Sequence, residues 1–129
     1  PVCKWWLQSI EKSIDIRLGK KQFLSKAELI EAVRKYCEDK QTHSEELATT
    51  YGWPIGKWDV SLITDFSYVF QNRRRFNEDI REWNVSNGTK FDFMFDRARL
   101  FNQAIGCWDV SNATSFRGVY DAASSFNQD

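Results

Sequence analysis

The apolar residues in the second half of the chain recur with a period of 25 residues. This pattern divides residues 55–129 into three copies, 55–79, 80–104 and 105–129. A period of about 20–50 residues is typical of architectures in which one unit cannot bury its apolar side alone and stacks on its neighbours. The aligned apolar positions are Ile55/Ile80/Ile105, Trp58/Trp83/Trp108, Val60/Val85/Val110, Phe66/Phe91/Phe116, Phe70/Phe95/Tyr120 and Phe76/Phe101/Phe126.

Within one copy the spacing of apolar residues changes from two to three and four. Trp58 and Val60 alternate with polar neighbours, which favours a short strand with both apolar side chains facing inward. Phe66, Val69 and Phe70 then follow a helical spacing. We therefore predict an α/β solenoid in which each coil has a short strand, a tight corner and one or two helical turns.

Equivalent residues of stacked copies are expected to lie above one another. Trp58, Trp83 and Trp108 should then form a column, and burial of these large rings should make it the main energetic spine. Polar residues recur as regularly as the apolar ones, and we expect them to form hydrogen-bonded ladders that satisfy buried corners. The ladder positions include Asn77, Asn102 and Asn127, with Ser61/Ser86/Ser111 and Thr64/Thr89/Thr114.

Residues 1–54 are predicted to be a helical cap segment that continues into the repeats as one domain. Spacings of four between Trp6, Ile10 and Ile14 predict a short helix over residues 5–16. Trp5 cannot share the helix face of Trp6, so either Trp5 stays partly exposed or both tryptophans pack under the end of the solenoid.

Two further helices are predicted from capping signals. Ser25 precedes Glu28 by three positions, the spacing of a capping box, and an apolar face follows, so we expect a helix over 26–38. The same spacing recurs from Thr42. It predicts a second, shorter helix that ends at Tyr51, before Gly52.

The repeat motif itself resembles that of the BspA-type leucine-rich-repeat proteins. The resemblance spans residues 23–129 and includes the helical segment before the repeats. The motifs that carry it are WDVS at residues 58–61, WNVSNGT at 83–89 and WDVSNAT at 108–114, with FNED, FNQA and FNQD beginning at Phe76, Phe101 and Phe126.

This resemblance implies a leucine-rich-repeat-like solenoid with a binding role and no common enzymatic activity. It also implies a surface or secreted protein. The chain departs from the family pattern at several positions. Gly88 and Ala113 stand where valine is usual, and Arg73 stands where the later copies have alanine. Phenylalanine replaces the usual methionine at positions 66, 91 and 116.

Composition argues against several classes of partner. Lysine plus arginine and aspartate plus glutamate number 18 each, so no global field favours nucleic acid or an anionic membrane. No apolar run approaches the roughly 20 residues of a membrane span. The start lacks a signal-peptide pattern, but the chain begins at Pro1 rather than methionine. The compartment is therefore not readable from the sequence, and an organelle remains an alternative to the cell surface.

The three cysteines, Cys3, Cys37 and Cys107, have no metal-binding spacing. We favour three thiols over a Cys3–Cys37 or Cys3–Cys107 bridge. Neither a metal nor any other cofactor is predicted.

The sequence provides no catalytic constellation. His43 is the only histidine, and nothing places a nucleophile and an orienting group beside it. Asp59 and Asp109 recur, but the middle copy has Asn84 there. A metal ligand or general acid would lose its charge at that position, whereas a turn accepts Asp and Asn alike. We therefore predict turns, and no catalytic or metal-binding residues.

We predict a non-enzymatic module that binds another protein or protein complex, with Trp5, Arg73, Arg74 and Arg75 as candidate contacts. Nucleic acid is not expected, because Glu78 and Asp79 follow the three arginines. The alternative is a peripheral structural subunit that stabilises a larger assembly, an organellar membrane assembly among them, with only indirect contact to the membrane.

The side of the third copy that faces away from the second is expected to be uncovered. It should expose Trp108, Val110 and Phe116 together with unpaired backbone groups. A further repeat, a partner or a second copy of the chain would cover it.

Overall fold

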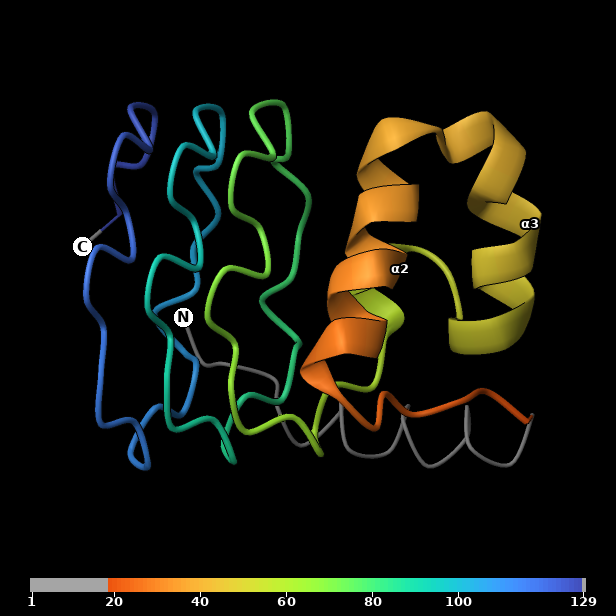
Figure 1. Cartoon of the computed structure of the whole chain (residues 1–129), viewed down its shortest axis with the longest axis horizontal. Helices are drawn as coiled ribbons and strands as arrows, with labels where there is room; N and C mark the ends of the chain where they lie inside the picture. The colour runs from red at the N-terminus through yellow and green to blue at the C-terminus, as the bar shows by residue number, and fades with distance from the viewer. Residues whose placement is uncertain (1–18, 129) are drawn as a thin grey trace.

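The computed structural model describes residues 19–128. The described chain contains α2 (Lys26–Glu38), α3 (Lys40–Tyr51) and the single 3₁₀ turn η1 (Ile55–Lys57). Three irregular turns of chain then lie side by side, with α2 beside the first of them (Figure 1). The helix expected over residues 5–16, and with it Trp5, lies outside the described residues.

The predicted α/β leucine-rich-repeat-like solenoid is wrong, because residues 19–128 contain no β-strand. Extended pairing in this range is limited to single parallel bridges, Asp65 to Lys90 and Lys90 to Ser115. The expected helical turns are absent too. Val69 N–H donates to Phe66 O and Gln71 N–H to Tyr68 O, each closing a tight turn that is not continued into a helix.

Left-handed backbone explains why the predicted helical turns do not form. Tyr68 and Asn72 have positive φ, and the equivalent residues of the later repeats do as well, with values between +53° and +68°. Two such residues, four positions apart, bend the chain twice in each repeat, since neither a strand nor an α-helix uses this region. Hydrophobic spacing reports side-chain burial and carries no direct information on the sign of φ. The later positions are Phe93, Arg97, Gly118 and Ala122.

Neighbouring repeats are joined by backbone hydrogen bonds at alternate residues. The N–H groups of four residues in the first repeat donate to carbonyls of the second at 2.8–3.0 Å, and four in the second donate to the third at 2.7–2.9 Å. Residues about 25 positions apart therefore face one another. Between the first and second repeats, the donors Phe66, Tyr68, Phe70 and Asn72 bond in that order to Lys90, Asp92, Met94 and Asp96. Between the second and third repeats, the donors Phe91, Phe93, Phe95 and Arg97 bond in that order to Ser115, Arg117, Val119 and Asp121.

Phenylalanine rings, rather than tryptophans, stack directly on their equivalents. Phe66 and Phe91 lie 5.4 Å apart between ring centroids, and Phe91 and Phe116 are equally spaced. Two further columns run through Phe70, Phe95 and Tyr120 and through Phe76, Phe101 and Phe126. These columns form the centre of the repeat core.

Each later tryptophan instead bridges two neighbouring repeats. The Trp83 ring contacts Phe70 of the preceding repeat at 5.4 Å between centroids, and its indole N–H donates to Ile55 O at 2.8 Å. Trp108 contacts Phe95 and donates to Ile80 O at 3.1 Å in the same way. Because the Trp83 ring is buried and its only donor is satisfied inside the core, Trp83 combines packing with a hydrogen bond.

The capping box correctly predicts α2 with its observed bounds. Ser25 Oγ accepts from Glu28 N–H at 3.2 Å, and Glu28 accepts in return from Leu24 N–H at 3.0 Å. The buried face of α2 reaches the first repeat, since the Tyr36 ring meets that of Trp58 edge-on at 5.6 Å. Its buried residues are Leu29, Ala32, Val33 and Tyr36.

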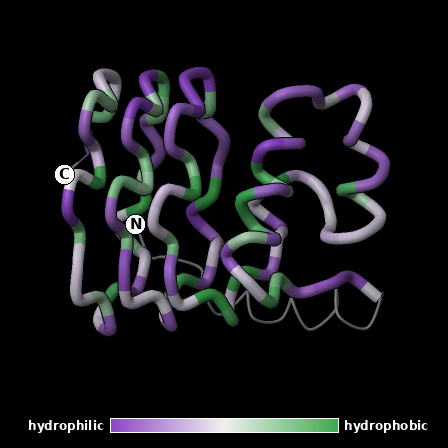
Figure 2. Tube along the Cα trace, in the orientation of Figure 1, coloured by the Kyte–Doolittle hydropathy of each residue, from purple (hydrophilic) through white to green (hydrophobic). Residues whose placement is uncertain are grey.

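The start of α3 differs from the prediction. Asp39, not Thr42, caps the helix, because its carboxylate accepts the Thr42 backbone N–H at 3.0 Å. The helix therefore begins at Lys40 and ends at Tyr51. Figure 2 shows that α3 is mostly hydrophilic, and Leu47 is its fully buried residue.

We expect Glu28→Gln to flatten the acid dependence of stability. Burial raises the pKa of Glu28, but hydrogen bonds from Leu24, Lys21 and Tyr51 outweigh it and hold the pKa below the usual 4.5. A carboxylate whose pKa is depressed by folding contributes stability above its unfolded pKa and loses it as the pH falls through the folded pKa.

The free energy of unfolding of the wild type should therefore fall more steeply below about pH 4.5 than that of the variant. Urea unfolding between pH 3 and pH 7 measures this difference. At pH 7 the variant should be less stable by about 1 kcal/mol. Parallel pH profiles would show that Glu28 makes no such contribution.

Candidate functional site

The three consecutive arginines lie at a pocket between the end of α2 and the first repeat. The pocket has a volume of about 570 Å³ and is lined by both signs of charge, since Glu38 and Glu78 share it with Arg73, Arg74 and Arg75. Tyr36 donates to Glu78 at 2.6 Å, and burial together with this bond raises the pKa of Tyr36.

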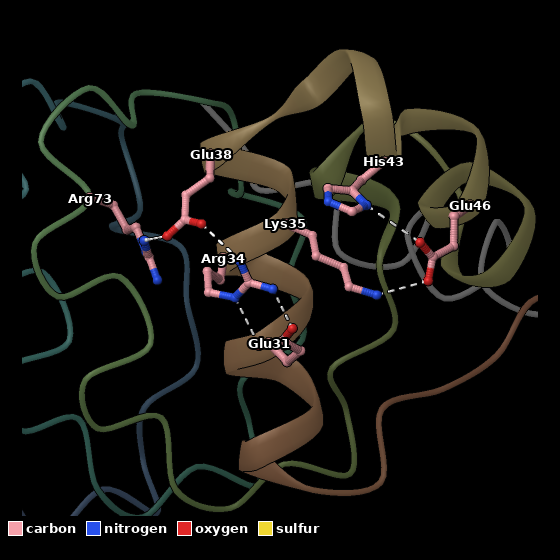
Figure 3. Close-up of polar contacts among 7 residues, drawn as sticks. All are labelled: Glu31, Arg34, Lys35, Glu38, His43, Glu46 and Arg73. Carbon is pink, nitrogen blue, oxygen red and sulfur yellow. Dashed lines mark hydrogen bonds and ion pairs between the residues drawn. The ribbon is translucent and has the colours of Figure 1, made fainter.

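Arg73 is held at this junction by an ion pair rather than left free. Its guanidinium donates to Glu38 at 3.2 Å, and Figure 3 shows Glu38 between Arg73 and Arg34. Hydrogen bonds from Arg34 and then Arg73 lower the pKa of Glu38. Arg73 Nε is buried without a partner among residues 19–128. The arginine corner therefore carries a structural link from α2 to the first repeat, and its mixed charge does not select an anion.

His43 lies on α3 among charged side chains. Its Nδ1 is 3.5 Å from Glu46, which also accepts from Lys35 at 2.9 Å (Figure 3). No serine, threonine or cysteine side chain in the described range donates to the His43 ring, so these contacts contain no activated nucleophile. The described residues also include no group of three or more His, Cys, Asp or Glu that could hold a metal ion.

The recurrent Asp or Asn after each tryptophan forms a turn, as the sequence predicts. Asp59 Oδ1 accepts from Ser61 N–H at 3.0 Å and from its hydroxyl at 2.5 Å. Asn84 makes the same two bonds to Ser86 at 3.1 and 2.6 Å. Asp109 does so with Ser111. An amide serves as well as a carboxylate in this turn, because the serine two residues later bonds only one side-chain oxygen; the second oxygen of Asp59 accepts from Gln22 at 2.9 Å.

Polar side chains also connect each repeat to the next. Thr89 donates through both its N–H and its hydroxyl to Thr64 O, and Thr114 does the same to Thr89 O. At the opposite corner, Asn77 Oδ1 accepts from Asn102 N–H at 2.8 Å. Asn102 Oδ1 accepts from Asn127 N–H at 3.0 Å. These bonds set the register between repeats.

The outer side of the third repeat is an apolar surface that the repeats leave open. Phe116 is 47% exposed, whereas its equivalents Phe66 and Phe91 are 0% and 2% exposed. An open pocket of about 320 Å³ lies on this side. We call this surface the third-repeat face and define it by Ile105, Trp108, Val110, Phe116, Tyr120 and Phe126.

The same face carries unpaired backbone groups. The N–H groups of Phe116, Gly118, Tyr120 and Ala122 have no acceptor among the described residues, although their equivalents in both earlier repeats are paired. Several carbonyls that accept side-chain donors in the earlier repeats have no such donor in the third repeat among the described residues, and three of them belong to Ile105, Ser111 and Thr114. The equivalents of Ile105 O accept from the indole N–H of Trp83 and Trp108. Those of Ser111 O accept from the side-chain amides of Asn87 and Asn112. Those of Thr114 O accept from the hydroxyls of Thr89 and Thr114.

Two cysteines, Cys37 and Cys107, lie in the described range, and only one of them is disulfide-bonded. Cys37 is half-buried and forms no disulfide. Cys107 is disulfide-bonded, and its partner lies outside the described residues. The expectation of three thiols is therefore wrong for Cys107. A partner distant in the sequence leaves no spacing signal, so the local motif could not predict it.

Sequence reasoning found part of the third-repeat face. It correctly predicted that Trp108, Val110 and Phe116 are less buried than their equivalents. It missed the alternate-residue row of N–H donors, because a backbone donor has no residue-type signature. Tyr120 could have been found, since it is the one tyrosine at a position where the earlier copies have phenylalanine.

The chain belongs to the family described as "Mycoplasma protein of unknown function, DUF285", which matches residues 40–129. No curated protein and no solved structure matches the chain. The resemblance to BspA-type proteins stays a prediction. The described helices include none that is long and apolar enough to cross a membrane.

Proposed function

We propose that this chain is a non-enzymatic protein-binding module and that the third-repeat face is its binding surface. The observation that carries the proposal is the contrast in burial between equivalent residues. Phe66 and Phe91 are almost fully covered by neighbouring chain, whereas Phe116 keeps 47% of its surface exposed. Exposed apolar surface next to unpaired backbone groups is typical of a site that another chain covers.

The geometry favours a polypeptide over a small molecule. The open N–H groups recur at alternate residues, from Phe116 to Ala122, and an extended chain offers carbonyls at that spacing. A compact ligand would occupy the pocket of about 320 Å³ and still leave donors along this row uncovered. Nucleic acid is disfavoured because the residues that define the face include no lysine or arginine.

We expect Phe116→Asp to abolish partner binding while Leu62→Asp leaves it intact. Phe116 and Leu62 are exposed to nearly the same extent, 47% and 49%, but only Phe116 lies on the third-repeat face. A charge at the centre of an apolar contact must be desolvated on binding, which typically weakens affinity at least tenfold, about 1.4 kcal/mol.

The test compares wild type and both variants as immobilised baits in extract of the source cells. Any protein retained by wild type and Leu62→Asp but not by Phe116→Asp is then purified, and its affinity for all three baits is measured by calorimetry. Thermal unfolding of both variants controls for folding. A partner that binds all three equally would place the binding surface elsewhere.

A further inference from the structure

We propose that a ridge of exposed arginines on the first two repeats binds an acidic segment of a partner polypeptide. The ridge lies at the corner formed by residues 71–75, 96–100 and 121–125, at the top of the repeats in Figure 1. We call it the arginine ridge and define it by Arg74, Arg75, Arg97 and Arg99. Both repeats already have a neighbour on each side, so the exposure of the ridge is independent of what covers the third-repeat face. The inference therefore does not rest on the proposed function.

The charges of the ridge are not neutralised within the part of the chain that the structure describes. Other arginines in this range form ion pairs with carboxylates, namely Arg34, Arg73 and Arg81. No residue of the arginine ridge forms an ion pair among residues 19–128. Asp96 lies at the same corner, but it is buried and accepts from Gln71 at 2.9 Å. The ridge is thus a local excess of positive charge in a chain of zero net charge.

Stacking of the repeats places two of these charges next to each other. Arg74 and Arg99 are equivalent residues of the first and second repeats, and the backbone joins the two corners where Leu100 N–H donates to Arg74 O at 3.1 Å. Equal charges at directly neighbouring positions repel each other. A carboxylate that binds between the two guanidinium groups relieves this repulsion.

The third repeat forms the same corner without arginine. One backbone hydrogen bond of 3.0–3.1 Å closes the turn in each repeat, from Arg73 to Phe70 O, from Ala98 to Phe95 O and from Ala123 to Tyr120 O. At the ridge positions the third repeat has small residues, Ala122, Ser124 and Ser125. The fold of the corner therefore does not require the arginine side chains.

Arg97 supports the same conclusion from its backbone. Its φ is +61°, in the left-handed region that glycine and asparagine adopt more readily than other residues. The first repeat has Asn72 at this position. Arginine is thus not the residue that the backbone favours there, and contact with a partner gives its side chain a role.

The surroundings of the ridge favour a polypeptide with separate charges over a continuous polyanion. Glu38 and Glu78 line a pocket with Arg75 on the side of the first repeat, and Asp121 lies on the side of the third, where its carbonyl accepts from the second repeat. A nucleic acid or an anionic membrane would bring negative charge against these carboxylates too. Leu100 is 50% exposed at the position equivalent to Arg75, so the corner also offers an apolar contact.

An extended acidic segment meets both requirements. Its alternate side chains point the same way, so carboxylates can lie against the arginines while an apolar side chain lies against Leu100. The planar guanidinium group binds a carboxylate through two parallel hydrogen bonds. Arginine is found at all four positions of the ridge, and lysine at none.

The experiment titrates a labelled peptide of about ten residues, in which glutamate alternates with glycine and one glycine is replaced by leucine, into the 129-residue chain. We expect saturable binding at low salt with a dissociation constant below about 1 mM. Affinity should fall at least about tenfold between about 0.05 M and 0.5 M salt, because exposed charges are screened. The same peptide with glutamine in place of glutamate should not bind.

Matched variants locate the contact on the protein. Arg74→Ser combined with Arg99→Ser gives both positions the residue that the third repeat has at Ser124, so the corner should still form. This double variant should bind the peptide at least about tenfold more weakly. Arg117→Ser is the control, because Arg117 is exposed and forms no ion pair among the described residues but lies outside the ridge. It should bind within about twofold of wild type.

Thermal unfolding at low salt distinguishes a binding role from a structural one. The double variant should be at least as stable as wild type, because the substitutions remove the repulsion between Arg74 and Arg99. A double variant that is less stable than wild type would show that these arginines serve the fold, and the inference would fail.

Three binding results would also overturn the inference. They are no binding of the glutamate peptide, equal binding of the glutamine peptide, and equal weakening by Arg117→Ser and the double variant. Tighter, ridge-dependent binding of single-stranded oligothymidylate or of inorganic phosphate would assign the ridge to a phosphate ligand instead. Phe116→Asp should keep peptide binding, since Phe116 lies on the third-repeat face. Failure of this inference and failure of the proposed function are therefore observed in different variants.

Discussion

Replacing Trp83 by alanine should destabilise the protein by about 3–5 kcal/mol, the usual range for a buried aromatic residue. Trp83 is 2% exposed, lies against Phe70, and donates its indole N–H to Ile55 O inside the core. The substitution removes the ring contact and one of the two donors to Ile55 O, which keeps its bond from Trp58 N–H, so packing and hydrogen-bond losses add. The free energy of unfolding from urea titration measures the effect.

Trp108→Ala is the matched control, because Trp108 makes the equivalent contacts but is only half-buried. Trp108→Ala should lower the free energy of unfolding by less than half as much as Trp83→Ala does. Trp83→Phe separates the packing contribution from the hydrogen-bond contribution, since it keeps a ring and removes the donor. We expect it to lower the free energy of unfolding by about 1–2 kcal/mol. Equal losses for Trp83→Ala and Trp108→Ala would mean that cover by the next repeat does not determine the contribution of this position.

Gly88→Val should destabilise the protein by about 1–3 kcal/mol, although the resemblance to BspA-type repeats favours valine there. A Cβ at Gly88 would lie 2.6 Å from Phe91 Cζ, 2.9 Å from Val85 O and 3.0 Å from Phe66 Cδ2. The φ of Gly88 is not in the left-handed region, so the conflict is one of space. The Val85 carbonyl belongs to the backbone and cannot move aside like a side chain.

The equivalent residue of the third repeat, Ala113, provides the control. Ala113 is half-buried beside the third-repeat face, so Ala113→Val should change stability by less than about 0.5 kcal/mol. Thermal unfolding of both variants against wild type gives the comparison. A Gly88→Val protein as stable as wild type would show that the second repeat has room for the family's usual residue, and that the rings of Phe66 and Phe91 do not limit it.

The side-chain pattern correctly predicted two features whose decisive hydrogen bonds are local in the sequence. Ser25 and Glu28 lie three residues apart, and the start of α2 is as predicted: Ser25 Oγ accepts from Glu28 N–H, and the Glu28 carboxylate accepts from Leu24 N–H. Asp59 and Asn84 interchange because each bonds a serine two residues later. The same local reasoning placed the start of α3 wrongly, because Asp39 competes with Thr42 as the cap and takes the Thr42 N–H itself.

The predicted strands failed for a reason that the pattern does not contain. Alternation at Trp58 and Val60 favoured a half-buried strand, but the backbone there closes local turns instead of pairing with a neighbour: Trp58 N–H donates to Ile55 O, and Val60 O accepts from Ile63 N–H. The turn at Phe66 to Phe70 was read as helical from its spacing. Left-handed backbone at Tyr68 ends any such helix, and φ at a non-glycine residue has no reliable sequence signal.

The candidate site also has features that the sequence predicts and features that only the structure shows. That the third repeat has an open apolar side was predictable from the repeat count and from Trp108, Val110 and Phe116. The row of free N–H groups was not, because it depends on which edge of a repeat donates and which accepts. The arginine corner also needed the structure, since the pairing of Arg73 with Glu38 joins residues 35 positions apart.

The sequence by itself determined the period, the equivalence of positions 25 residues apart and the absence of net charge. These follow from residue identity, and a repeated pattern places like residues above like in any stacked arrangement. Only the tertiary structure decided that phenylalanine rings stack on their equivalents while tryptophans bridge neighbouring repeats. It alone also decided which backbone donors stay open, because backbone direction and cover arise from neighbouring chain rather than from residue type.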